Sequence, residues 1–398
     1  MSKHYIIIGN STAGLFALKT IREKDIAGNI TLVSDEPCMA YSRVLLTNYL
    51  AGEIEYGQLF LTDQAFYNRF MVNLVVGVKV VSVEPGTKKV LLANGKAIKY
   101  DSLLLATGSR PYFPKQISPS SEGVFGFRNL NDATAIKNKI RKDTKIIVLG
   151  GGPSGIKIAC ALRKAGAAPE LIVSSPHILS QVTDDESAKI IHSRLESHGI
   201  SIRTGISIKS LLTNKSRIQG VKLDNGQTID CCALVVCKGV CPNSELLTEY
   251  TSESGAIKVD KLMRTPVHNV YAAGDVVETY DIAYRKYCNA ATWPHASLQG
   301  RVAGSNMAGV KKLYRGTLSR NAIEIMGLPL ITIGVINAPN LEGWEVQYVP
   351  GGSTSYRKLI YRDGILAGAI LLGEVEDAGL LHSEIRRNNT NLTAGMRE

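Results

Sequence analysis

The sequence predicts an α/β fold with two similar parallel-sheet units and a smaller α+β domain towards the end of the chain. Three observations lead to this prediction. Residues 5–33 have the order strand, helix, strand, and residues 145–173 repeat it about 140 residues later. Each is the βαβ pattern of a parallel sheet. From about residue 314, alternating strands precede a helix near 377–387.

Each parallel-sheet unit opens on an apolar strand that leads into a helix. In the first unit the strands span 5–8 and 30–33, and apolar residues at every third position mark the helix between them. In the second unit, strands at 145–149 and 171–173 flank a helix at 155–164. Strands joined by a helix pair in parallel, so we expect two parallel sheets.

Two connections divide the chain into domains. A strand at 102–105 ends in a tight turn, and the Pro- and Ser-rich stretch 111–121 indicates a linker. A second crossover is expected from Gly239 to Asn243. The strands expected in the tail are 330–335, 344–349, 356–361 and 365–372. We therefore expect a discontinuous first domain at 1–112 and 243–312, a second domain at 113–242 and an α+β domain at 313–398.

The composition is that of a globular protein. Of the 398 residues, 44% are hydrophobic and 20% charged, and no apolar run of about 18 residues exists. We expect no membrane segment. The first residues lack a signal-peptide pattern and the seven cysteines are scattered, so we expect a cytoplasmic protein with reduced thiols. The net charge of +11 favours an acidic partner, but without a basic block we expect no nucleic-acid partner.

The turn after the first strand has the form of a dinucleotide-binding fingerprint. Gly9 and Gly14 occupy the first and third glycine positions, and Ser11 replaces the second glycine. Thr12 and Ala13 lead into the helix, whose N-terminus offers free amides and the positive end of its dipole to a pyrophosphate. The turn alone is a weak signal, and its place between a strand and a helix strengthens it.

The corresponding turn of the second unit is a stronger match. Gly150, Gly152 and Gly155 occupy all three glycine positions, and Pro153 and Ser154 complete the turn before the helix. Both units are therefore expected to bind a nucleotide.

The two units differ at the end of their second strand. Asp35 and Glu36 follow the strand of the first unit, where a carboxylate can accept hydrogen bonds from ribose hydroxyls. Ser174 and Ser175 stand there in the second unit. The missing acid weakens the case for NADH, and no arginine follows closely to hold the 2′-phosphate of NADPH, so both nucleotides stay open.

These stretches assemble into a pattern that covers nearly the whole chain. The chain resembles the pyridine nucleotide-disulfide oxidoreductase superfamily, whose members bind FAD in one Rossmann-like domain and NAD(P)H in another. The resemblance implies that both domains are of the three-layer ββα type. The matching stretches are 9–14, 100–111, 150–155, 239–243 and 270–276.

Further residues are similar to one branch of this superfamily. Glu36, Tyr41 and Arg43, with the stretches 289–296 and 361–373, look like the branch of nitrite reductase flavin domains, rubredoxin reductases and ferredoxin reductases. The resemblance implies that Glu36 and Arg43 contact the FAD and that Gly239 lies by the nicotinamide nucleotide. It also implies a homodimer contact through the C-terminal domain.

The resemblance implies roles for residues around the FAD. Val80 would contact the adenine, and the turn of Ala106, Thr107 and Gly108 would lie along the cofactor. Asp275 would bind the ribityl or pyrophosphate region, where Gly274 permits the close approach.

One end of the flavin is expected to meet a helix N-terminus. Trp293 would lie against the isoalloxazine, and Pro294 fits the first helical position. The amides of His295 and Ala296 would then point at the flavin and stabilise its negative charge.

The cysteine of the disulfide reductases is missing. They carry a redox cysteine on the helix after the first acidic strand, but residues 41–49 contain none, and Cys38 lies earlier, in the turn. We therefore expect electrons to leave the flavin directly, without a thiol relay.

A second difference concerns a pair of charges near the flavin. Relatives often hold a lysine from the position of Asn48, paired with a glutamate from the position of Lys157. We hypothesise that the positive charge has moved to Lys157, where it would favour the reduced flavin.

The cysteines near residue 235 invite a metal interpretation. Their spacing fits no usual zinc or iron–sulfur pattern, and Cys231 to Cys237 lie on an expected strand, where side chains alternate between faces. We expect buried thiols and no metal. Cys231, Cys232, Cys237 and Cys241 form this group.

The leading hypothesis is an FAD-dependent oxidoreductase that passes electrons between NAD(P)H and an acidic iron–sulfur protein, in either direction. The partner would be a ferredoxin, a rubredoxin or the iron–sulfur subunit of a larger complex. Alternatives are an NADH oxidase, the flavin subunit of a nitrite-reductase-like enzyme and, outside the enzymes, a flavin-bearing scaffold.

Overall fold

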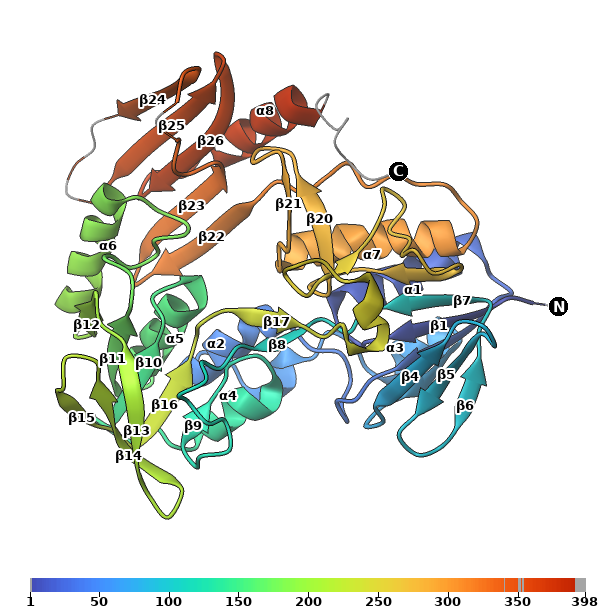
Figure 1. Ribbon diagram of the computed structural model, residues 1–398, viewed down its shortest axis with the longest axis horizontal. Coiled ribbons are helices and arrows are strands. Elements are labelled where there is room, and N and C mark those ends of the chain that lie inside the picture. Colours follow the sequence, from blue (N-terminus) through green and yellow to red (C-terminus); the bar gives the residue numbers. More distant parts are fainter. Residues whose placement is uncertain (1, 340, 350–351, 353, 391–398) are drawn as a thin grey trace.

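The computed structural model describes residues 2–339, 341–349, 352 and 354–390. Two parallel sheets form the centres of two neighbouring units, and a third, antiparallel sheet packs beside the second (Figure 1). Within these described ranges, no helix is long and apolar enough to cross a membrane.

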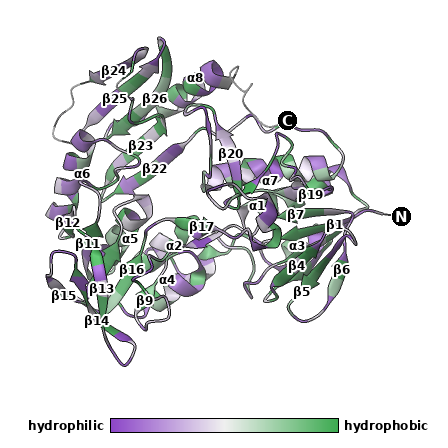
Figure 2. Ribbon diagram, in the orientation of Figure 1, coloured by the Kyte–Doolittle hydropathy of each residue, from purple (hydrophilic) through white to green (hydrophobic). Residues whose placement is uncertain are grey.

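The first parallel sheet has an apolar centre. Its strands are, in spatial order, β19 (Val270–Ala272), β7 (Ser102–Leu105), β1 (His4–Ile8), β2 (Asn29–Val33) and β3 (Val72–Val75). All neighbouring pairs are parallel. β1 and β7 are covered on both faces, and their near-continuous Leu and Ile content is typical of such strands (Figure 2).

Two helices cover one face of this sheet, and a small antiparallel sheet covers the other (Figure 1). The helices are α1 (Thr12–Lys24) and α7 (Trp293–Met307), and the small sheet contains β4 (Val80–Glu84), β5 (Lys89–Leu92) and β6 (Ala97–Lys99). The helices lie in close contact, because a Cβ at Gly300 would come within 2.3 Å of the Ala13 carbonyl oxygen. Four short helices connect β2 to β3: η1 (Arg43–Leu45), α2 (Leu46–Ala51), η2 (Tyr56–Leu59) and α3 (Gln64–Arg69).

The second parallel sheet repeats this plan. Its strands are, in spatial order, β12 (Ser201–Thr204), β11 (Ala168–Val173), β10 (Lys145–Leu149), β16 (Ala233–Val236) and β9 (Val124–Phe125). Its helices are α4 (Leu130–Lys137), α5 (Pro153–Lys164) and α6 (Asp185–Ser197). A three-stranded antiparallel sheet again accompanies it, with β13 (Ile208–Asn214), β14 (Arg217–Leu223) and β15 (Thr228–Asp230).

The chain leaves the first unit and returns to it along one two-stranded ribbon. β8 (Ser109–Pro111) pairs antiparallel with β17 (Val240–Pro242), and Arg110 on β8 forms an ion pair with Glu245 at 2.5 Å. The expected domain boundaries at 112/113 and 242/243 lie at this ribbon and stay a prediction. The returning chain then forms η3 (Glu245–Tyr250), β18 (Ile257–Lys258), β20 (Val277–Asp281) and β21 (Lys286–Cys288).

The C-terminal part is the expected α+β domain. Its antiparallel sheet has the order β22 (Arg320–Ile325), β23 (Leu328–Gly334), β26 (Ile365–Leu372), β25 (Tyr356–Arg362) and β24 (Trp344–Val349), followed by α8 (Ala378–Thr390). The sequence-based expectation missed β22, in which exposed residues alternate with half-buried ones up to the buried Ile325. It also extended one strand over Cys231 to Cys237, whereas β16 contains only the four apolar residues between the cysteines.

Asp184 joins the second unit to the C-terminal sheet. It is the N-cap of α6, and its Oδ2 accepts hydrogen bonds from Tyr356 Oη at 2.5 Å and Lys358 Nζ at 2.9 Å. Burial opposes ionisation of Asp184, but the hydrogen bonds from Ser187, Tyr356 and Lys358 outweigh it and lower the pKa of the carboxyl. Lys358 is buried too, so each charge depends on the other.

We predict that Asp184→Asn lowers the free energy of unfolding by about 3 kcal/mol, because it leaves the buried ammonium of Lys358 unpaired while asparagine keeps the helix cap. The folded-state pKa of Asp184 is lowered, so its stabilisation is complete above about pH 4 and is lost as the pH falls through that lowered pKa. Urea titrations at several pH values measure this.

The matched control is Asp185→Asn, which removes an exposed ion pair with Lys189 and should cost well under about 1 kcal/mol. Equal losses in the two variants would contradict the role of Asp184 as an anchor.

Candidate functional site

The first glycine turn brings a strand end and a helix start into direct contact. A Cβ at Gly9, whose φ is +121°, would lie 2.1 Å from the Ala106 carbonyl oxygen at the end of β7. A Cβ at Gly14 would lie 2.0 Å from the Gly9 carbonyl oxygen. No side chain fits at either position. The sequence predicted both requirements from the fingerprint alone.

Ser11 is the N-cap of α1, and its side chain makes no capping hydrogen bond. Its hydroxyl and the amides of the first helical turn, which begins at Thr12, are therefore available to a ligand. At the equivalent place in the second turn, a Cβ added to Gly152 would have no neighbouring atom within 4 Å. A serine is thus sterically compatible with this turn.

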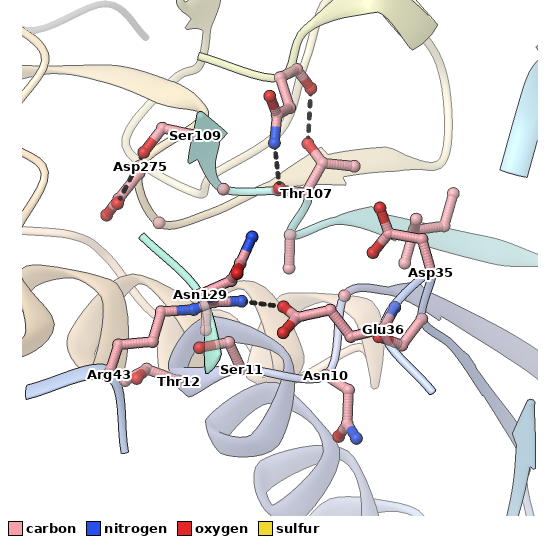
Figure 3. Close-up of a pocket in the computed structure, with 18 of the residues that line it drawn as sticks. Asn10, Ser11, Thr12, Asp35, Glu36, Arg43, Thr107, Ser109, Asn129 and Asp275 are labelled. Atoms are coloured by element: carbon pink, nitrogen blue, oxygen red, sulfur yellow. Dashed lines mark hydrogen bonds and ion pairs between the residues drawn. The ribbon is translucent and has the colours of Figure 1, made fainter. Parts of the chain in front are cut away.

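A cavity of about 840 Å³ opens in front of the first glycine turn. It reaches from the ends of β1 and β2 across the ribbon strand β8 to the start of α7. Figure 3 shows some of its lining residues, among them Ser11, Glu36 and Asp275. The predicted residues that line it are Gly9, Ser11, Thr12, Ala13, Asp35, Glu36, Arg43, Val80, Ala106, Thr107, Gly108, Gly274, Asp275, Trp293 and Ala296. Gly14, His295 and Lys157 are not among its lining residues.

The two predicted ribose-binding acids have different surroundings. Glu36 forms an ion pair with Arg43 and accepts a hydrogen bond of 2.5 Å from Tyr41 Oη (Figure 3). Tyr41 is buried, which raises its pKa, and its oxygen also accepts from the Leu130 amide at 3.0 Å. Asp35 is exposed. The side chain of Glu36 is therefore fixed, and that of Asp35 is free to follow a ligand.

Arg128 is a cavity residue that the sequence reasoning missed. It lies just before the N-cap of α4, forms an ion pair with Asp275 and donates from Nε to the Ser109 carbonyl at 3.3 Å. Ser109 Oγ also donates to Asp275 Oδ2, at 3.1 Å. The sequence signal that could have pointed to Arg128 is the capping box of Asn129 and Asp132, which fixes the backbone beside this arginine.

The turn after β7 is tied to the returning chain. Thr107 Oγ1 donates to the Asn243 carbonyl at 2.7 Å, and Asn243 Nδ2 donates back to the Thr107 carbonyl at 2.9 Å. The hydroxyl of Thr107 is thus used to close the fold, and its backbone faces the cavity. Gly274 has a φ of +87°, and a Cβ there would lie 3.1 Å from Ala13 Cβ.

The start of α7 differs in detail from the expectation. Trp293, not Pro294, is the first helical residue after the N-cap Thr292. The amide of Ala296 already donates to the Thr292 carbonyl at 3.0 Å, so the expectation that it is available to a ligand is wrong. His295 is in the first turn, where amides lack a partner within the helix, and its ring points to the Leu318 carbonyl.

The second glycine turn repeats the geometry of the first. A Cβ at Gly150, with φ +123°, would lie 2.3 Å from the Cys237 carbonyl oxygen at the end of β16. A Cβ at Gly155 would lie 1.9 Å from the Gly150 carbonyl oxygen. Gly152 is the N-cap of α5, and Pro153 and Ser154 form its first turn.

The side chains predicted near this second turn are only partly free. Ser175 Oγ donates to the His177 carbonyl at 2.8 Å, so it is engaged in its own loop. Ser174 is exposed at the end of β11, and Gly239 has a φ of +96°, as the turn after β16 requires.

Known proteins share both the sequence pattern and this geometry. Residues 3–300 match the pyridine nucleotide-disulphide oxidoreductase family. The chain belongs to this family. Residues 320–389 match the C-terminal domain of rubredoxin NAD+ reductase. The chain of this oxidoreductase therefore matches characterised domains along most of its length, and its cofactors are FAD and NAD(P)H.

Relatives of this oxidoreductase include subunit epsilon of the NADH-dependent phenylglyoxylate dehydrogenase of Aromatoleum evansii, 32% identical over 98% of this chain and 92% of the relative. The NADH oxidase of Methanocaldococcus jannaschii is 28% identical over 92% of this chain and 87% of the relative. The fold is also that of the reductase in the covalent putidaredoxin reductase–putidaredoxin complex, with a TM-score of 0.88 and 21% identity over 97% of this chain and 93% of that chain.

The cavity of the oxidoreductase fits FAD. Its glycine turn admits a pyrophosphate, and the guanidinium groups of Arg43 and Arg128 supply the positive charge. Asn10 lines the cavity, and its Nδ2 is a buried donor without a partner among the described residues. Glu36 or Asp35 would hold the ribose hydroxyls, and Trp293 would lie at the flavin end.

One cysteine is among the residues that line the cavity of the oxidoreductase. Cys38 lies there with Glu36 and Arg43, and burial together with Glu36 raises the pKa of its thiol. Burial also raises the pKa of Cys231 and of Cys237 to about 12, so these thiols stay protonated. Over the described ranges, no three metal-ligating side chains gather at one point.

We predict that Arg128→Ala weakens FAD binding by about tenfold or more, because Asp275 would then face the pyrophosphate without its counter-charge. The measurement is flavin released on dilution, followed by fluorescence. Arg217→Ala removes an exposed arginine of the other unit and is the control. Unchanged retention in Arg128→Ala would contradict a role for Arg128 in binding the cofactor.

Proposed function

We propose that this oxidoreductase passes electrons between NAD(P)H and an acidic iron–sulfur protein, without a thiol relay. The observation that carries the proposal is the position of Trp293. This residue lines the FAD cavity and is also 43% exposed, so the flavin end of the cavity reaches the outer surface. The bound flavin supplies the conversion between a two-electron hydride donor and a one-electron acceptor.

The surface around Trp293 is aromatic and basic. The ring of Trp293 lies edge-on to Phe16, with centroids 5.7 Å apart. The guanidinium of Arg301 lies 4.5 Å from the Phe16 centroid, and Lys19 Nζ lies 5.7 Å from it. We name these four residues the Trp293 patch. Arg301 is exposed and Lys19 half-buried. Cations around an aromatic edge favour an acidic partner by steering and by complementarity.

The relatives support an iron–sulfur acceptor. The C-terminal domain is of the rubredoxin NAD+ reductase type, and the fold is that of a reductase joined to putidaredoxin. An oxidase remains the second candidate, since the Methanocaldococcus jannaschii relative is named an NADH oxidase. Either direction of electron flow is compatible with the site.

A homodimer is proposed through the C-terminal domain. β24 is an edge strand of the C-terminal sheet, and Tyr348 and Val349 on it are 60% and 46% exposed. An edge strand with exposed apolar residues is suited to pairing with a second copy. Sedimentation velocity of the purified chain decides its oligomeric state.

The proposal predicts fast anaerobic reduction of an acidic ferredoxin or rubredoxin by NAD(P)H, with a rate that falls as salt rises. Arg301→Glu should lower kcat/KM for the carrier about tenfold or more and leave the nucleotide-dependent bleaching of the flavin unchanged in stopped flow. Arg217→Glu is the control. Rapid turnover with oxygen alone, and none with any carrier, would support the oxidase instead.

Lys157 is proposed to raise the potential of the flavin. Burial lowers its pKa, and among the described residues it forms no ion pair. It lies on α5, which packs against α2, where Asn48 donates to Glu53 at 2.7 Å. Glu53 is already paired with Lys164 at 2.7 Å. A half-buried, unpaired ammonium gains stability when negative charge forms nearby.

We predict that Lys157→Met lowers the flavin midpoint potential by about 30 mV or more, and that Lys157→Glu lowers it further. Spectroelectrochemical titration measures the shift. Lys164→Met removes a lysine of the same helix that is already paired, and its potential should stay close to that of the wild type. An unchanged potential in Lys157→Met would exclude the role.

A further inference from the structure

Lys238 reaches across the second nucleotide unit to the place where an acid is missing. Its Nζ donates a hydrogen bond of 2.8 Å to Ser174 Oγ. Lys238 follows β16, whereas Ser174 follows β11, and the two strands are separated by β10. The lysine side chain therefore spans the carboxyl end of β10.

The path of this side chain crosses the expected position of the nucleotide. Dinucleotides bind outside the carboxyl ends of parallel strands, over the glycine turn. That turn touches the residue before Lys238, since a Cβ at Gly150 would meet the Cys237 carbonyl oxygen at 2.3 Å. The ammonium of Lys238 thus lies beyond the pyrophosphate turn, on the side of β11, where the adenosine ribose is bound.

The chemistry at this point suits a phosphate better than ribose hydroxyls. An ammonium offers three donors and no acceptor, whereas ribose hydroxyls are held by a carboxylate that accepts. Residues 174–183 contain no Asp or Glu. Across the described ranges, Lys238 forms no ion pair, so its charge is uncompensated. Ser174 accepts from Lys238 and keeps its own hydroxyl proton to donate.

We infer that Lys238 and Ser174 form a 2′-phosphate subsite and that the oxidoreductase prefers NADP(H) over NAD(H). Lys238 acts as the specificity-determining residue. It follows β16, whereas the acid that holds the ribose usually follows the strand equivalent to β11. This nucleotide differs from the one in the name of the Aromatoleum evansii relative, which is NADH-dependent. The inference rests on the proposed use of a nicotinamide nucleotide and is independent of the acceptor.

The test is equilibrium binding to the FAD-loaded protein by isothermal titration calorimetry. The probes are NADP+ against NAD+, and 2′,5′-ADP against 5′-AMP, which differ by the 2′-phosphate alone. We expect the wild type to bind the phosphorylated member of each pair about tenfold or more tightly. Lys238→Met should remove most of this preference and change the affinity for NAD+ by less than about twofold.

Two further variants complete the test. Ser174→Asp should invert the preference, because the new carboxylate pairs with Lys238 and accepts from ribose hydroxyls. Lys145→Met removes a lysine at the opposite end of the same sheet and should leave both affinities unchanged. Flavin absorbance of each variant reports that the fold and the first site are intact.

The outcomes separate clearly. Tighter binding of NAD+ by the wild type would overturn the inference. If Lys238→Met weakened the binding of NAD+ and NADP+ equally, the inference would also be overturned, because the lysine would then bind the pyrophosphate that both nucleotides share. A protein that prefers NADP+ but reduces no iron–sulfur carrier would support the inference and overturn the proposed acceptor alone.

Discussion

Both nucleotide sites depend on a contact that leaves no room for a side chain. A glycine just after one strand lies against the carbonyl of the residue just after the neighbouring strand. Gly9 lies against Ala106 in this way, and Gly150 against Cys237. This contact turns the chain by the shortest route into a helix, so the helix N-terminus meets the open end of the sheet. Any Cβ here would push the helix away and enlarge the distance between its amides and a phosphate.

Sequence reasoning located the features that a short stretch of chain determines by itself. The two glycine turns and the central strands follow from local patterns, and most of the cavity lining follows from the family resemblance. Arg128 and Lys238 were missed as site residues because each reaches its partner from a distant part of the chain. The small antiparallel sheets came only from the family resemblance, as the third layer of each Rossmann-like unit, because their strands are short and half-exposed and their apolar alternation is weak. The expectation that the Ala296 amide is available was wrong because α7 begins at Trp293, one residue before Pro294, so this amide already donates within the helix.

Charges in the FAD cavity come in opposed pairs. Arg43 forms an ion pair with Glu36, and Arg128 forms one with Asp275. Each side chain of these pairs is largely shielded from solvent, so an isolated charge would be costly. Within each pair the acid and the arginine neutralise each other. With FAD bound, the arginines would lie beside its pyrophosphate and Glu36 beside its ribose hydroxyls.

The two units place different side chains at one equivalent position, the residue before the glycine that follows β7 in the first unit and β16 in the second. In the first unit it is Thr107, whose hydroxyl is bonded to Asn243 on the returning chain. In the second unit it is Lys238, whose flexible side chain extends over the open end of the sheet. In the first unit this position therefore joins two parts of the cavity wall, as suits a cofactor that stays bound through many turnovers. In the second unit the side chain makes no such connection, as suits a substrate that must leave after each turnover.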